Sequence, residues 1–70
     1  MRISARNQLA GEVVEIEEGA VNAVVKIRLD GTDVVVSSSI TMDSVHELGL
    51  TVGSRATAVI KASSAMVAVD

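Results

Sequence analysis

The sequence contains no cysteine, no aromatic residue and a single histidine. The lack of cysteine excludes disulfide bonds and thiolate zinc sites, and one histidine is too few for a histidine-rich metal site. The lack of aromatic side chains removes the stacking platforms on which single-stranded nucleic acids bind. Nine acidic residues against six Lys and Arg give a formal net charge of -3, which also argues against nucleic acid as a partner.

Long apolar runs are missing as well. The longest extend over only a few residues, such as the valines at 34–36, so no segment is long enough to span a membrane. The N-terminal stretch lacks the apolar region of a signal peptide. We therefore expect a cytoplasmic protein with no membrane partner.

The apolar residues that are present are small. Hydrophobic residues make up 49% of the 70 residues, yet none is aromatic, so the core must be built from short aliphatic side chains. A domain of this size usually needs disulfides, a metal or a partner subunit to be stable. Because disulfides and the usual zinc sites are excluded, we expect an obligate oligomer.

Alternating side chains predict strands over most of the chain. Between residues 21 and 29, apolar side chains alternate with a second face that carries Asn22, Lys26 and Arg28, the period of a half-buried strand. Asp30-Gly31 predicts a hairpin turn, because both residues tolerate a positive φ. The expected strands cover residues 11–17, 21–29, 33–38, 55–61 and 66–69.

A short helix is expected between the third and fourth strands. Thr41 is a good N-cap for a helix over residues 42–48, with Met42, Val45 and Leu48 on one face and Gly49 as the stop. Five strands with one short helix in this position is the element order of an OB-type barrel. We therefore expect an all-β fold, a five-stranded OB-like barrel, in a single domain over residues 1–70.

Few residues could support catalysis. His46 lies on the expected helix, where a solvated or packed side chain is the simplest interpretation, and no nucleophile–base–acid set can be assembled around it. Glu15, Glu17 and Glu18 lie near the end of a strand, which favours a solvated charged face over paired catalytic carboxylates. We expect that the protein is not an enzyme.

Three segments are rich in hydrogen-bond donors: residues 4–7, residues 37–44 and residues 61–64. They bring together hydroxyl groups, two cations (Arg6 and Lys61) and the start of the expected helix. A tetrahedral dianion needs this combination of hydroxyls, backbone amides and one or two fixed cations. Taken singly, each of these features has an ordinary explanation: Thr41 can simply cap the helix, and Arg6 and Lys61 can simply be surface charges.

Taken together, these segments resemble a known family. The sequences Ser-Ala-Arg-Asn-Gln-Leu at 4–9, Gly-Ala-Val-Asn-Ala at 19–23, Ser-Ile-Thr-x-x-Ser at 39–44, Leu-Gly-Leu-x-x-Gly at 48–53 and Ile-Lys-Ala-Ser at 60–63 resemble the Mop domain. This is the molybdate-binding, OB-like module of the molbindins, and the related TOBE domain occurs in transporter ATPases. The resemblance extends over nearly the whole chain.

The resemblance implies a homohexamer, a trimer of dimers, with oxyanion sites between subunits. The main site would combine two segments from one region with a Thr-x-x-Ser segment from a neighbouring subunit: Ser4, Ala5, Arg6, Lys61 and Ser63 with Thr41 and Ser44. Arg6 and Lys61 would neutralise charge, the four hydroxyls would donate hydrogen bonds, and the Ala5 N–H would help to complete the shell. A second site near the threefold axis would use the backbone of Ala20, Val21 and Asn22.

The implied function is binding of molybdate or tungstate for molybdenum storage and homeostasis, with no organic cofactor. Hydrogenphosphate carries a proton that needs an acceptor, so a shell of donors alone disfavours it. Two alternatives remain open: an oxyanion-sensing regulatory module, and a binder of the molybdenum-pterin cofactor. A pterin usually stacks on aromatic side chains, which this sequence does not have.

Overall fold

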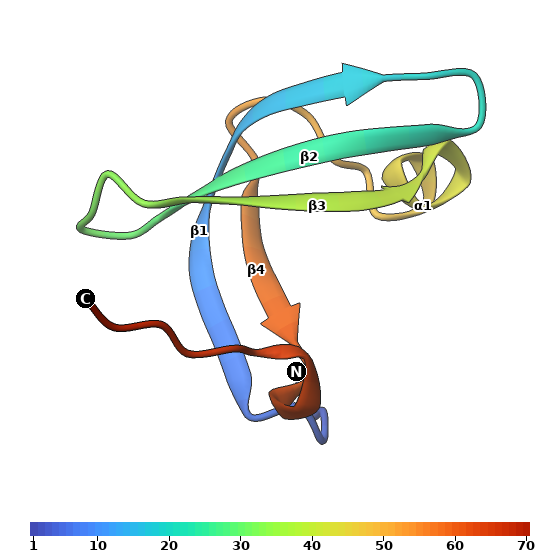
Figure 1. The fold of residues 1–70 in the computed structure, drawn as a ribbon. Helices are drawn as coiled ribbons and strands as arrows, with labels where there is room; N and C mark the ends of the chain where they lie inside the picture. The colour runs from blue at the N-terminus through green and yellow to red at the C-terminus, as the bar shows by residue number, and fades with distance from the viewer.

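The computed structural model describes all 70 residues. It is a mostly β fold with one short α-helix (Figure 1). The elements in chain order are β1 (Asn7–Glu18), β2 (Asn22–Leu29), β3 (Val35–Thr41), α1 (Met42–Glu47), β4 (Arg55–Ile60) and the 3₁₀ turn η1 (Ala62–Ser64). Neither helix has the length and apolar character that crossing a membrane requires.

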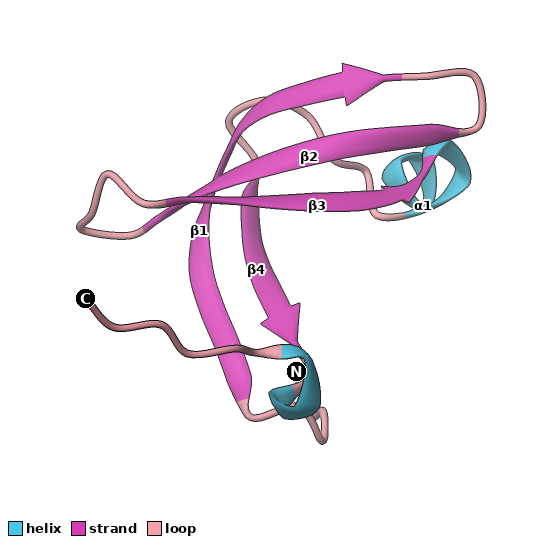
Figure 2. Ribbon diagram, viewed as in Figure 1, coloured by secondary structure: helices cyan, strands magenta, loops and turns pink.

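The long first strand organises a single antiparallel sheet of order β3-β2-β1-β4. Its first half pairs with β4 and its second half pairs with β2, with a register shift between Val13 and Glu15. The sheet curls at this shift, so that β2 and β3 run across the direction of β4 and form a half-barrel (Figure 2). Gly11 lies in both pairings, and a Cβ there would overlap the carbonyl oxygen of Arg28. The curled sheet therefore requires glycine at this position.

The core is small. Its buried hydrophobic residues are Val13, Ala23, Val25, Ile27, Val45 and Ala58. None is larger than isoleucine, as the composition predicts. The concave side of the half-barrel remains an open, mainly apolar groove of about 870 Å³ between β4 and the β2–β3 hairpin.

The predicted fifth strand does not form in this chain. Residues 66–69 pair with no other strand, and Met66, Val67 and Val69 are more than 90% exposed. The 3₁₀ turn η1 directs the chain out of the line of β4, so the C-terminal segment leaves the sheet (Figure 1). The sheet leaves free edges at β3 and β4, but the turn at η1 carries this apolar segment away from β4, so it pairs with neither edge. The five-stranded barrel is thus observed as a four-stranded half-barrel.

The hairpin between β2 and β3 is wider than the expected two-residue turn. Leu29 N–H donates to the carbonyl of Val34 at 2.9 Å, which closes a loop over residues 30–33. Within this loop only Gly31 has a positive φ, of 71°, whereas Asp30 keeps an ordinary backbone conformation. The Thr32 hydroxyl donates to the Leu29 carbonyl at 2.9 Å and holds the loop.

The α-helix begins at Met42 as predicted and ends at Glu47, one residue before the expected end. The Thr41 hydroxyl accepts the Ser44 N–H at 3.0 Å, and Gly49 follows the helix with a φ of 62°. Val45 is buried in the core, but Leu48 is 68% exposed at the rim of the groove and does not share the buried face.

Candidate functional site

Two of the predicted site segments lie side by side at one end of β1 and β4. Asn7 pairs with Ile60 in the last position of the β1–β4 ladder. Residues 4–6 precede Asn7 and residues 61–63 follow Ile60, so antiparallel pairing brings these two segments together. We call residues 4–6 and 61–63 the cation end of the molecule.

Backbone donors at the cation end are free. The N–H groups of Ser4, Ala5 and Arg6 donate no hydrogen bond within the chain, and neither do those of Ala62 and Ser63. The hydroxyls of Ser4 and Ser63 have no partner in the chain either. These groups are available to donate to a bound oxyanion.

The charge at the cation end is also uncompensated. Neither Arg6 nor Lys61 has a carboxylate within ion-pair distance. No acidic residue occurs in residues 1–11 or in residues 56–69. In a chain of net charge -3, this end therefore carries a local excess of positive charge that attracts anions.

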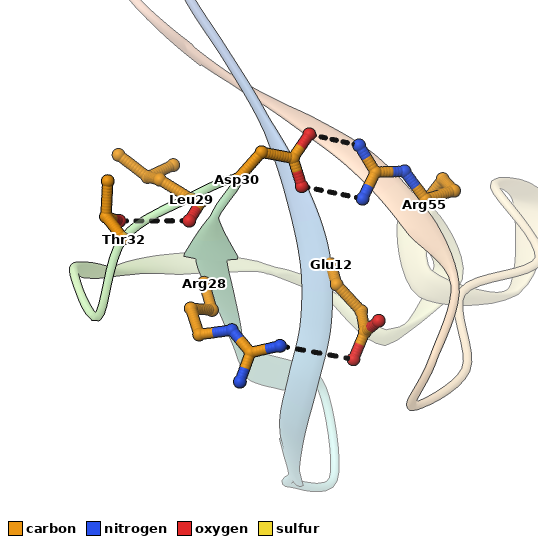
Figure 3. Close-up of polar contacts among 6 residues, drawn as sticks. All are labelled: Glu12, Arg28, Leu29, Asp30, Thr32 and Arg55. Carbon is orange, nitrogen blue, oxygen red and sulfur yellow. Dashed lines mark hydrogen bonds and ion pairs between the residues drawn. The ribbon is translucent and has the colours of Figure 1, made fainter.

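The cations in the middle of the sheet, by contrast, are paired. Lys26 lies 2.8 Å from Glu15, and Arg28 lies 4.0 Å from Glu12. Arg55 forms a two-pronged pair with Asp30 across the rim of the half-barrel (Figure 3). These three cations are neutralised within the chain and are poor candidates for binding an external anion.

The surface pairs shift the pKa values of their members in the expected directions. Hydrogen bonds to Arg55 lower the pKa of Asp30, and those to Asp30 raise the pKa of Arg55. The hydrogen bond to Lys26 lowers the pKa of Glu15. The prediction that this acidic face is solvated is confirmed, because Glu15, Glu17 and Glu18 are all exposed.

The remaining predicted segments meet at the other end of the molecule. Asn22 lies opposite Thr41 across β2 and β3, and the Met42 N–H donates to the Val21 carbonyl at 2.7 Å. The turn at 20–22 and the helix start at 41–44 are therefore neighbours, which we call the hydroxyl end. The N–H groups of Ala20 and Val21 donate no hydrogen bond within the chain.

The two hydroxyls of this end are already linked to each other. Thr41 Oγ1 donates to Ser44 Oγ at 2.9 Å while it accepts the Ser44 N–H. The Thr41 proton is thus used within the chain, whereas the Ser44 proton remains free to donate. Asp43 and His46 on the same helix are exposed.

One chain does not bring the two ends together. Residues 4–6 precede β1, whereas the 20–22 turn follows it, and Asn7–Glu18 is a strand of 12 residues. At about 3.3 Å per residue such a strand is roughly 36 Å long before curvature. The cation end and α1 are well separated in the fold (Figure 1).

The comparisons with known proteins identify the fold. Residues 3–67 match the TOBE domain family. The chain belongs to this family. A probable molybdenum-pterin-binding protein from Haemophilus influenzae is 54% identical over 70 residues, which cover all of both chains. The resemblance to the Mop group seen in the sequence is thus confirmed.

Solved structures agree with this assignment. MopII from Clostridium pasteurianum superposes on this TOBE domain with a TM-score of 0.89 and 43% identity, covering 97% of this chain and 100% of MopII. The cytoplasmic molybdate-binding protein ModG, solved with molybdate bound, gives a TM-score of 0.82 and 52% identity. That match covers 89% of this chain and 43% of ModG.

One hydrogen bond at the cation end, from Gln8 to Ala5, could not be predicted from the spacing of residues. The Gln8 side chain donates to the Ala5 carbonyl at 2.8 Å, a contact that residue type does not predict either. The resemblance includes Gln8 among its matching residues, but only the structure shows which atom it contacts.

Proposed function

We propose that this protein binds molybdate, with tungstate as an equivalent ligand, in a site that two subunits build together. The observation that carries the proposal is the composition of the cation end. Unpaired Arg6 and Lys61 stand beside free backbone N–H groups and the hydroxyls of Ser4 and Ser63, with no carboxylate in these segments. The bound molybdate of ModG, at 52% identity, supports this choice of ligand.

A donor-only shell explains which anions would bind. Molybdate and tungstate are fully deprotonated near neutral pH and present only acceptor oxygens. Hydrogenphosphate carries a proton, and leaving it without an acceptor costs on the order of 1–3 kcal/mol. Because molybdate and tungstate differ little in size, the site should bind them equally well.

The second half of the site would come from the hydroxyl end of a neighbouring subunit. Thr41 and Ser44 lie at the hydroxyl end, and the length of β1 separates them from an anion held by Arg6 and Lys61 of the same chain. Association would also cover apolar surface that one chain leaves open, namely the groove and the exposed side chains of Met66, Val67 and Val69. We propose a homohexamer, a trimer of dimers, with a second set of sites at Ala20, Val21 and Asn22.

Binding of a molybdenum-pterin cofactor is the second candidate, because the Haemophilus influenzae relative is named for it. The present chain offers no aromatic side chain on which a pterin could stack. The free groups at both ends suit an inorganic oxyanion better. In the cell, a multi-site oxyanion binder of this kind would serve molybdenum storage and homeostasis.

Calorimetric titration combined with native mass spectrometry tests the proposal. Molybdate and tungstate should bind the oligomer with similar affinity, and phosphate should bind about fivefold more weakly or worse. Tight binding of the pterin cofactor with no binding of free molybdate would favour the second candidate. Equal binding of phosphate and molybdate would reduce the cation end to a general anion patch.

A further inference from the structure

Gln8 makes the one side-chain hydrogen bond at the cation end. Its Nε2 donates to the carbonyl oxygen of Ala5 at 2.8 Å, three residues earlier in the chain. Gln8 is an exposed residue near the start of β1, so this bond anchors residues 4–6 to the rigid strand.

The bond fixes more than the carbonyl. The peptide unit that joins Ala5 to Arg6 is planar and trans, so the Ala5 carbonyl and the Arg6 N–H point in opposite directions. When Gln8 holds the oxygen on its own side, the N–H must face away from it. The Arg6 N–H donates no hydrogen bond within the chain and is therefore both fixed in direction and free.

The bond also removes an acceptor from the site. A carbonyl oxygen that turned toward a bound dianion would repel it, whereas an N–H group attracts it. With the Ala5 oxygen held by Gln8, that peptide offers the anion its donor side.

We propose that Gln8 is a positioning residue for the oxyanion site: it holds the Ala5–Arg6 peptide so that the Arg6 N–H donates to the bound anion. This inference rests on the proposed function. It adds to the site one backbone donor, the Arg6 N–H, and the Gln8 side chain that orients it. Gln8 itself does not touch the anion.

The test replaces Gln8 with methionine, which is similar in length but has no N–H. Molybdate affinity, measured by calorimetry on the assembled protein, should fall about 5-fold to 10-fold, the size of one lost hydrogen bond. Thr32→Val is the matched control, because Thr32 also donates to a carbonyl three residues earlier, at 2.9 Å, but in the β2–β3 loop. It should leave molybdate affinity unchanged.

A spectroscopic readout separates positioning from general stabilisation. In the wild-type protein, molybdate should move the Arg6 amide proton strongly downfield in the NMR spectrum. In Gln8→Met this shift should largely disappear, while the thermal midpoint of unfolding changes no more than in Thr32→Val. Gln8→Asn, whose amide is one methylene too short, should behave like Gln8→Met and replaces it if the methionine variant fails to assemble.

The outcomes distinguish the two proposals. Suppose that the wild-type protein binds molybdate. If both Gln8 variants then bind it with the same affinity, or keep the downfield shift of the Arg6 amide proton, only the proposed role of Gln8 is overturned. A wild-type protein that does not bind molybdate would overturn the proposed function and the role of Gln8 together.

Discussion

Arg6 and Lys61 flank the last residue pair between β1 and β4, in which Asn7 lies opposite Ile60. The chain thus places two cations next to the end of this ladder, with no carboxylate paired to either of them. Like charges in such a position repel each other, and a bound dianion would relieve that repulsion. This placement supports the proposal of an anionic ligand.

Arg6→Ala should weaken molybdate binding much more than Arg28→Ala. Removing a charged partner from a desolvated anion costs on the order of 2–5 kcal/mol of binding free energy. Arg28 is the matched control, because it is an arginine already paired with Glu12 at 4.0 Å, and losing a surface charge costs less than about 1 kcal/mol. Equal dissociation constants for the two variants in calorimetry would contradict the assignment of Arg6.

Thr41→Val should lower both helix stability and molybdate affinity. The substitution removes the N-cap, at about 1 kcal/mol of unfolding free energy, and the hydroxyl that is hydrogen-bonded to Ser44. Thr41→Asn keeps a capping oxygen, so it should restore stability without restoring affinity.

Thr51→Val is the control for Thr41→Val, because Thr51 and Ser54 form the same kind of hydroxyl pair, at 3.0 Å, outside both ends of the site. The control should bind molybdate like the wild-type protein. If Thr41→Asn also binds like the wild type, then the Thr41 hydroxyl has no part in the site.

Gly11→Ala should destabilise the fold by about 1–3 kcal/mol, because the new methyl group overlaps the Arg28 carbonyl where the sheet curls. Gly49→Asn is the tolerated counterpart: Gly49 has a φ of 62° with open space around it, a conformation that asparagine adopts readily. Urea unfolding of the ligand-free protein measures both. Equal stability of the Gly11 variant and the wild type would mean that the sheet curls less tightly at this point.

The Asp30–Arg55 pair predicts a loss of stability in acid. Arg55 holds the pKa of the Asp30 carboxyl below its ordinary value. A carboxyl whose pKa is lower in the folded chain stabilises the fold fully above its unfolded pKa, and this contribution is lost as the pH falls through the lowered folded value. Asp30→Asn should therefore flatten the acid side of a plot of unfolding free energy against pH.

The expected change is small, because both partners of that pair are exposed. Asp33→Asn is the control, since Asp33 is an exposed aspartate of the same loop with no ion pair. Identical acid profiles for the two variants would show that the pair with Arg55 does not contribute.

Local features of the fold could be predicted from the sequence, because neighbouring residues determine them. The Thr41 cap and the stop at Gly49 depend on side-chain type and allowed φ alone. The unpaired segment at residues 66–69 was predicted as a strand, because its apolar residue types favour a strand but do not reveal that η1 turns the chain away from the free edge of β4. The early start of β1, at Asn7, was missed because its polar first residues hide the pairing with β4.

The same limit applies to the site. The donor-rich segments were visible as residue types, and their family resemblance suggested a shared ligand. That residues 4–6 lie beside residues 61–63 depends on the register of two strands more than 40 positions apart in sequence, which a single sequence does not encode in its spacing. The bond from Gln8 to the Ala5 carbonyl likewise depends on how the chain turns before β1.

Mixing two defective variants tests the central claim, that each site takes one half from each of two subunits. Arg6→Ala damages the cation end and Ser44→Ala damages the hydroxyl end, so each variant alone should bind molybdate weakly. Coexpressed in equal amounts, the two chains should regain tight binding at about a quarter of the sites, where the intact end of one meets the intact end of the other. Mixed oligomers that regain no tight sites in calorimetry would contradict the account, because a site within one chain stays damaged in every combination.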